Sequence, residues 1–152
     1  MVKKLTKAEK RVAIAKDVLL RLRQGLKPTK GVYLHSPLID RLMRASAEDT
    51  QICDILKPNI SSCEVCGIGG LFVGALMKFD GLRAVEAPIL SFTAMCDHLL
   101  KYFSEAQLKL VEDAFEGWNK LQEYYSQYPK DKQRLAAIMK NIIRNKGTFK
   151  PF

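Results

Sequence analysis

Long hydrophobic runs are missing from this sequence. The longest uncharged apolar stretch, Val65–Met77, is shorter than the roughly 20 residues that a membrane-spanning helix needs. Close to the first residue, Lys10, Arg11 and Lys16 interrupt every apolar stretch, so the hydrophobic segment of a secretory signal is lacking. We therefore expect a protein that does not enter membranes and that works in the cytoplasm.

Histidine and strand-forming patterns are also scarce. Only 2 histidines occur, and no serine or cysteine stands at a spacing that indicates a catalytic nucleophile. No hairpin dipeptide is flanked by alternating apolar and polar residues, which argues against an antiparallel sheet. These absences favour a helical protein that is not an enzyme, and no cofactor is expected.

Glycine is concentrated in the most apolar part of the chain. The segment Ser61–Met77 contains Gly67, Gly69, Gly70 and Gly74. A glycine in a helix interior costs about 1 kcal/mol relative to alanine, so close approach of a neighbour must compensate. Ser61 with Glu64 has the spacing of a capping box. We therefore predict a helix over about 62–78, rich in small residues and buried at the centre of the fold.

Cap signals and hydrophobic spacing predict further helices around this central one. Thr6 with Glu9 and Ser104 with Gln107 form capping boxes, Ser36 is an N-cap, and Asp131 is expected to cap the last helix. The predicted helices cover residues 6–24, 37–45, 48–56, 62–78, 91–103, 104–118 and 131–146. The prediction is an all-α protein, an irregular compact bundle of five to seven helices in a single domain, 1–152.

Positive charge is concentrated at the two ends of the chain. Residues 1–30 contain ten basic and two acidic side chains, and residues 130–152 contain seven and one. Residues 31–129 carry a net charge of −5, and the whole chain carries +9. Because chain ends often lie close together in a domain, both basic ends could form one positive face for nucleic acid or an acidic protein. The alternative is that the two basic ends lie over the acidic residues 31–129 and only make the protein more soluble. The candidate binding residues are Lys3, Lys4, Lys7, Lys10, Arg11, Lys140, Arg144 and Lys146.

Four cysteines allow two kinds of thiol chemistry. Cys63 and Cys66 form a C-x-x-C on the expected first turn of the central helix, where the helix dipole lowers the pKa of a thiol. A redox role or a structural zinc site with Cys53 and Cys96, or with His98 or His35 as substitutes, is therefore an alternative. The interpretation that we prefer is that the cysteines are small residues packed in the core and that no metal is bound.

Aromatic side chains gather near the end of the sequence, interleaved with lysines. This group contains Trp118, Tyr124, Tyr125, Tyr128, Lys146, Phe149, Lys150 and Phe152. Such a mixture can stack on single-stranded nucleic acid, whereas Trp118 and some tyrosines are expected in the core. The acidic residues Glu112, Asp113 and Glu116 are expected on a solvated helix face, and His98 is expected to be packed or at the surface.

Short motifs resemble those of known small proteins. The run Cys66–Leu71 (CGIGGL) is similar to the C-A-[LI]-G-A-L pattern of small phage and bacterial proteins with no assigned activity, with Gly67 and Gly70 where alanines are usual. The segments SEAQLKLVEDAFE and RLAAIMKNIIRNKGTFKP also resemble phage proteins. The resemblance covers about a third of the chain and implies a phage-like accessory protein.

The sequence therefore predicts a small, non-enzymatic binding or accessory protein. A phage origin implies that it modulates a host process through an unknown protein partner in the host cytoplasm. The alternatives are a nucleic-acid-binding protein that uses the basic face, and a zinc or thiol-redox protein that uses Cys63 and Cys66.

Overall fold

Helices dominate the computed structural model, which describes residues 4–45, 50–82 and 92–152. In these residues the helices are α1 (Lys7–Arg23), α2 (Pro37–Arg44), α3 (Ile52–Leu56), α4 (Gly67–Lys78), α5 (Phe92–Leu99), α6 (Glu105–Glu116), α7 (Gln122–Gln127) and α8 (Asp131–Arg144). Two 3₁₀ helices, η1 (Lys57–Ser62) and η3 (Asn119–Leu121), connect them. The predicted helical bundle is confirmed, and the short α7 comes in addition to the helices expected.

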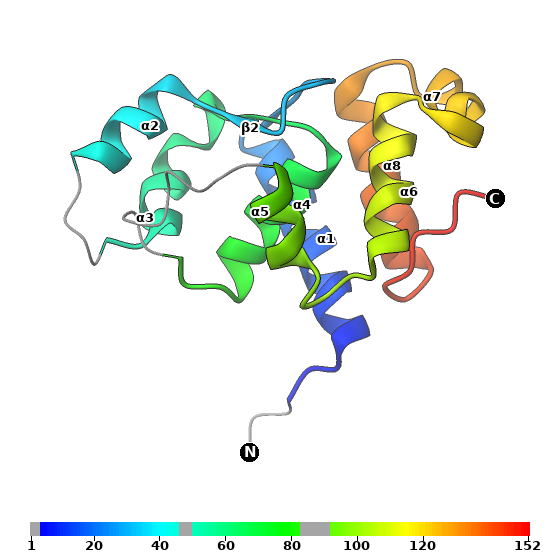
Figure 1. Cartoon of the computed structure of the whole chain (residues 1–152), viewed down its shortest axis with the longest axis horizontal. Coiled ribbons are helices and arrows are strands. Elements are labelled where there is room, and N and C mark those ends of the chain that lie inside the picture. Colours follow the sequence, from blue (N-terminus) through cyan, green and yellow to red (C-terminus); the bar gives the residue numbers. More distant parts are fainter. Residues whose placement is uncertain (1–3, 46–49, 83–91) are drawn as a thin grey trace.

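The central position of the glycine-rich helix is confirmed. All residues of α4 from Gly67 to Leu76 are buried, and the helix lies between α1, α5 and α6 (Figure 1). Its glycines allow these neighbours to approach. A Cβ at Gly67 would lie 3.2 Å from Phe115 Cβ of α6, and one at Gly74 would lie 2.9 Å from the carbonyl oxygen of Ile14 in α1. The missing side chains therefore bring two different helices close to α4.

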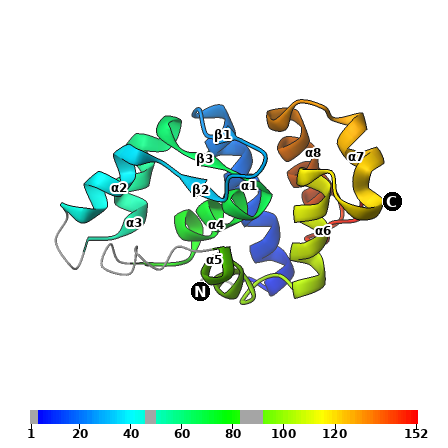
Figure 2. The same cartoon turned by 45° about the horizontal axis from the view of Figure 1, so that its top comes forward.

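The start of α4 corrects the predicted helix. Residues Glu64–Val65 form strand β3, which pairs in parallel with β1 (Lys27–Pro28) and antiparallel with β2 (Leu34–His35). Figure 2 shows the three strands together beside α4. Because β3 is paired along both edges, its residues are extended and the helix begins only at Gly67. The capping box predicted at Ser61 and Glu64 is therefore wrong, and the Cys66 side chain caps the helix instead.

The two basic ends of the chain do lie together. Helices α1 and α8 pack side by side (Figure 1), and the Nε of Arg11 donates a hydrogen bond to the carbonyl oxygen of Gly147 at 2.7 Å. A second bond joins Arg11 Nη1 to the carbonyl oxygen of Tyr102 at 3.0 Å. The helix that opens the fold is thus fastened to the segment that follows α8.

Two acidic residues expected on a solvated face are buried. Glu116 is 3% exposed and accepts hydrogen bonds from the Gly31 N–H, at 2.9 and 3.1 Å to its two oxygens. Asp113 is 5% exposed and accepts from Lys109 and from the Asn119 amide. Both carboxylates hold loops against α6, which explains why polar residues occupy buried positions.

Two further expectations about side chains are wrong. Trp118 is 48% exposed, because α6 ends at Glu116 and Gly117 turns the chain with a φ of +78°. Asp131 does not cap α8: Lys130 occupies the N-cap position, and the carboxylate of Asp131 instead binds the guanidinium of Arg134. By contrast, the capping box of Thr6 and Glu9 is present as predicted.

No helix in the described part of the chain is both long and apolar enough to span a bilayer. Predictions that fall on residues 1–3, 46–49 and 83–91 lie outside the described residues. They concern Lys3, the start of the helix predicted at 48–56 and the start of the helix predicted at 91–103.

Candidate ligand-binding groove

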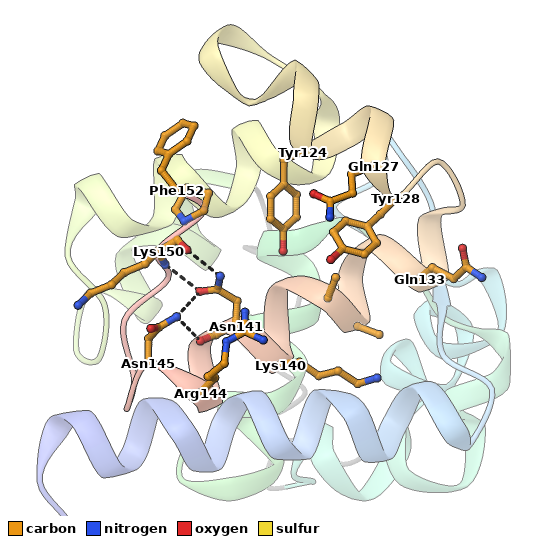
Figure 3. A pocket seen from close by; sticks show the side chains of 13 residues that line it. Tyr124, Gln127, Tyr128, Gln133, Lys140, Asn141, Arg144, Asn145, Lys150 and Phe152 are labelled. Atoms are coloured by element: carbon orange, nitrogen blue, oxygen red, sulfur yellow. Dashed lines mark hydrogen bonds between the residues drawn. The ribbon is translucent and has the colours of Figure 1, made fainter.

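A groove of about 880 Å³ opens between α7, α8 and the segment that follows α8 (Figure 3). It is lined by Tyr124, Gln127, Tyr128, Gln133, Ala136, Ala137, Lys140, Asn141, Arg144, Asn145, Lys150, Pro151 and Phe152. None of these described lining residues is acidic. The groove therefore combines aromatic rings, side-chain amides and positive charge.

Helix α8 supplies most of the positive charge. Lys140 and Arg144 are one helical turn apart, and Lys150 lies on the segment that follows α8. All three residues are exposed, and none forms an ion pair with another described residue. Arg144 lies in the last turn of α8, where the helix dipole favours a cation. The charges of all three residues are thus available to an anionic ligand.

Two tyrosines form the α7 wall. The rings of Tyr124 and Tyr128 lie 5.2 Å apart, and Tyr124 packs edge-on against Phe149 with ring centroids 5.6 Å apart. Figure 3 shows both hydroxyls directed toward α8. Burial and the neighbouring Tyr128 raise the pKa of Tyr124 to about 12, although Arg144 acts in the opposite direction. Tyr124 therefore remains a neutral hydrogen-bond donor at neutral pH.

The third wall is an extended segment held by two side-chain amides. Gln107 donates to the carbonyl oxygen of Phe149 at 3.0 Å and accepts from the Phe149 N–H at 2.7 Å. Asn141 does the same with Lys150, at 2.7 and 2.8 Å. The segment is thus paired on both sides, as a strand is in a sheet. It carries Phe152, whose side chain is 88% exposed, to the rim of the groove.

The predicted basic face is divided by the structure. Among the described residues of the predicted set, only Lys140 and Arg144 line the groove. Lys146 lies in a separate hollow between α1 and α8, together with Leu5 and Lys16. The remaining described members of the predicted set, Lys4, Lys7, Lys10 and Arg11, line none of the grooves described here.

Two of these predicted cations already have partners. Arg11 is bound by two carbonyl oxygens, and the ammonium of Lys10 lies 5.7 Å from the centre of the Phe79 ring. Lys4 and Lys7 are exposed. The prediction of one continuous face is therefore replaced by a narrower set, which gains Lys150.

The predicted aromatic group is divided in the same way. Tyr124, Tyr128 and Phe152 line the groove, and Phe149 is buried behind Tyr124. Tyr125 instead packs on the guanidinium of Arg134, at 4.2 Å. The interleaving of aromatic and basic residues indicated this region, but the side chains of Gln127, Gln133 and Asn145 gave no signal in the sequence.

No protein-family model, curated protein or solved structure matches this chain. The function of the groove must therefore be inferred from its own chemistry. The resemblance to small phage and bacterial proteins stays a prediction.

The thiol pair does not have the environment of a reactive site. Burial raises the pKa of Cys63 to about 12 and that of Cys66 to about 11. The N–H of Gly69 donates to the Cys66 sulfur at 3.4 Å, which favours the thiolate, but burial outweighs it. In the described residues no three side chains of His, Cys, Asp or Glu are grouped as metal ligands. These observations favour the packing interpretation of the cysteines.

Alkylation of the native protein at pH 8 is therefore expected to separate the cysteines into two pairs. Cys53 and Cys96 are partly exposed and should react first with iodoacetamide, whereas Cys63 and Cys66 should react only after denaturation. Mass spectrometry of peptides from a time course measures the order. Rapid modification of Cys63 or Cys66 in the folded protein would restore the redox alternative.

A polar cluster that the sequence did not reveal surrounds Asp80. Its carboxylate lies 2.7 Å from His98 Nε2, accepts a bond of 2.7 Å from the Tyr102 hydroxyl and pairs with Lys101 at 3.3 Å. No serine, threonine or cysteine in the described residues is hydrogen-bonded to His98. The cluster therefore acts as a structural tie between α5, the segment after it and the end of α4.

Proposed function

We propose that this protein is a non-enzymatic binding protein whose ligand is a single-stranded nucleic acid held in the groove between α7 and α8. The observation that carries the proposal is the combination of three cations without ion pairs, one exposed aromatic ring and two half-buried tyrosines, with no acidic residue among the described lining. Phosphates attract lysine and arginine, and every nucleobase has a flat face that stacks on an aromatic ring.

Each wall has a role in this proposal. Arg144, Lys140 and Lys150 would bind successive phosphates. Phe152, which is 88% exposed, would stack on a base, and the amides of Gln127 and Gln133 would bond to base edges. Tyr124 and Tyr128 support one another and would provide a second stacking surface together with a hydroxyl donor. A duplex hides its base faces and is expected to bind less well.

The test is fluorescence anisotropy with a labelled oligothymidylate. Phe152→Ala is expected to weaken binding by about 5-fold or more, because loss of one base–aromatic stack costs about 1–3 kcal/mol. Trp118→Ala is the matched control, because this exposed aromatic side chain does not line the groove and its loss should leave the affinity unchanged. Arg144→Gln should reduce the slope of log K against log salt by about 0.7.

Other outcomes of this experiment would exclude nucleic acid or indicate another ligand for the groove. If the wild-type protein binds no oligonucleotide at low salt, the nucleic-acid proposal is wrong. Salt-sensitive binding of a polyglutamate peptide would then identify an acidic protein segment as the ligand. A role in modulating a host process and a cytoplasmic location stay predictions.

A further inference from the structure

A second, smaller hollow lies on the other flank of α8. It has a volume of about 250 Å³ and is lined by Leu19, Leu22, Arg23, Lys132, Ala136 and Lys140. These residues come from α1 and α8, so we call the hollow the α1–α8 crevice. Its floor is aliphatic and its rim carries three cations, and no acidic residue is among the described residues that line it.

The cations at the rim of the crevice resemble those of the groove, because they have no ion-pair partner among the described residues. Arg23 and Lys132 are exposed, and within the described part of the chain neither forms an ion pair. An aliphatic floor edged by unpaired cations suits a ligand with a flat apolar part beside an anion. A nucleotide has this composition, because its base has an apolar face and its phosphate is charged.

The crevice and the groove share two residues. Ala136 and Lys140 line both, so the two hollows meet along the outer side of α8. In Figure 3 the Lys140 side chain extends from α8 toward α1. The residues Lys132, Lys140 and Arg144 follow one slowly winding ridge of α8. This ridge is about 18 Å long at 1.5 Å per residue, which is long enough for several successive phosphates.

We infer that the α1–α8 crevice is a second subsite for single-stranded nucleic acid, occupied by the part of the strand that leaves the groove across Lys140. The inference rests on the proposed function of the groove and extends it to the opposite flank of α8. Arg23 and Lys132 bind phosphates there, and the half-buried Leu19 supports a base. A strand too short to cross Lys140 occupies the groove alone.

Oligonucleotide length separates the two subsites. The double variant Arg23→Gln/Lys132→Gln is compared with wild type, using labelled oligothymidylates of about 4 and about 12 nucleotides in a salt titration. With the longer strand, the salt slope should fall by about 1.4, because two phosphate contacts are lost. The loss of affinity between 50 and 200 mM salt should then be about 7-fold smaller than for wild type. With the shorter strand, the slopes of the two proteins should agree.

A matched control removes the same charges elsewhere. Arg41→Gln/Lys57→Gln also replaces one arginine and one lysine, both exposed, on α2 and η1, which lie far from α8 in Figure 1. This variant should bind both strands as wild type does, apart from a small uniform effect of net charge. An equal change in slope for both double variants would mean that the crevice makes no specific contact.

The outcomes distinguish this inference from the function of the groove. If wild type binds the longer strand and Arg23→Gln/Lys132→Gln binds it with the same salt slope, the crevice is not a second subsite. The proposal for the groove then stands. If the double variant weakens the shorter strand as strongly as the longer one, the order of the two subsites is wrong. If wild type binds neither strand, the proposed function fails before the crevice is tested.

Discussion

Gly69→Ala is expected to destabilise the protein by at least about 3 kcal/mol. A Cβ at this position would lie 1.5 Å from the carbonyl oxygen of Tyr33 and 2.7 Å from its carbonyl carbon. Overpacking typically costs about 1–3 kcal/mol when a side chain can move aside, and here the obstacle is backbone. The Tyr33 carbonyl also accepts the hydrogen bond from the Cys66 N–H at 3.4 Å, so moving it disturbs the start of α4.

Gly70→Ala is the matched control for this substitution. It adds the same methyl group one residue further along α4, where the nearest atom is Leu135 Cδ2 at 3.3 Å, the end of a flexible side chain. Alanine gains about 1 kcal/mol in helix propensity, so we expect stability within about 1 kcal/mol of wild type. Urea denaturation followed by circular dichroism measures both variants. If Gly69→Ala unfolds at the same urea concentration as Gly70→Ala, Gly69 does not lie close to the Tyr33 carbonyl.

The density of glycine in a long apolar run was sufficient to predict a buried central helix, because such a helix must have close neighbours. The sequence did not identify those neighbours. Gly69 faces the backbone at Tyr33, and Gly74 faces Ile14, so the partners are distant in the sequence. Which chain segment approaches which glycine depends on tertiary packing, and no local pattern encodes it.

The helix start was misplaced because three strands of two residues each leave no alternating pattern in the sequence. Ser61 and Glu64 have the spacing of a capping box, yet the pairing of Glu64–Val65 on both edges holds this segment extended. Cysteine is not among the residues that usually cap helices, so Cys66 gave no signal as an N-cap.

Only part of the candidate site could be predicted from the sequence. Aromatic and basic residues that alternate near the end of the sequence indicated a surface for stacking and for phosphates. The sequence could not show that Arg11 is bound by carbonyl oxygens or that Lys150 and Arg144 line the same groove. The use of a cation as a structural donor or as a binding group depends on the atoms around it, which only the fold supplies.

Arg134→Met is expected to cost about 3–5 kcal/mol of stability and to weaken ligand binding as well. Arg134 is fully buried, and its guanidinium bonds to the carbonyl oxygens of Phe115 at 2.6 Å and Tyr128 at 2.9 Å. It also pairs with Asp131 and lies between the rings of Phe115 and Tyr125, 4.7 and 4.2 Å from their centres. Methionine fills much of the volume but leaves the carbonyls and the carboxylate without their donor.

Arg134→Met is expected to weaken ligand binding because of where the hydrogen bonds of the Arg134 guanidinium lie. Arg134 holds the turn between α7 and α8 through the carbonyls of Tyr128 and Pro129, and this turn sets the distance between the two walls of the groove. Oligonucleotide affinity should therefore fall in Arg134→Met even at a temperature at which the variant is folded, although the side chain does not line the groove. Arg134→Lys keeps the charge but lacks the planar fork, so we expect an intermediate loss of stability.

Arg41→Met is the control for losing an arginine, because Arg41 is exposed on α2 and its replacement should change stability by less than about 0.5 kcal/mol. Thermal unfolding and anisotropy on the same samples separate the two consequences of Arg134→Met. Unchanged stability would show that the buried guanidinium is not the anchor of the turn between α7 and α8. A destabilised but folded variant with wild-type affinity would show that the turn does not set the width of the groove.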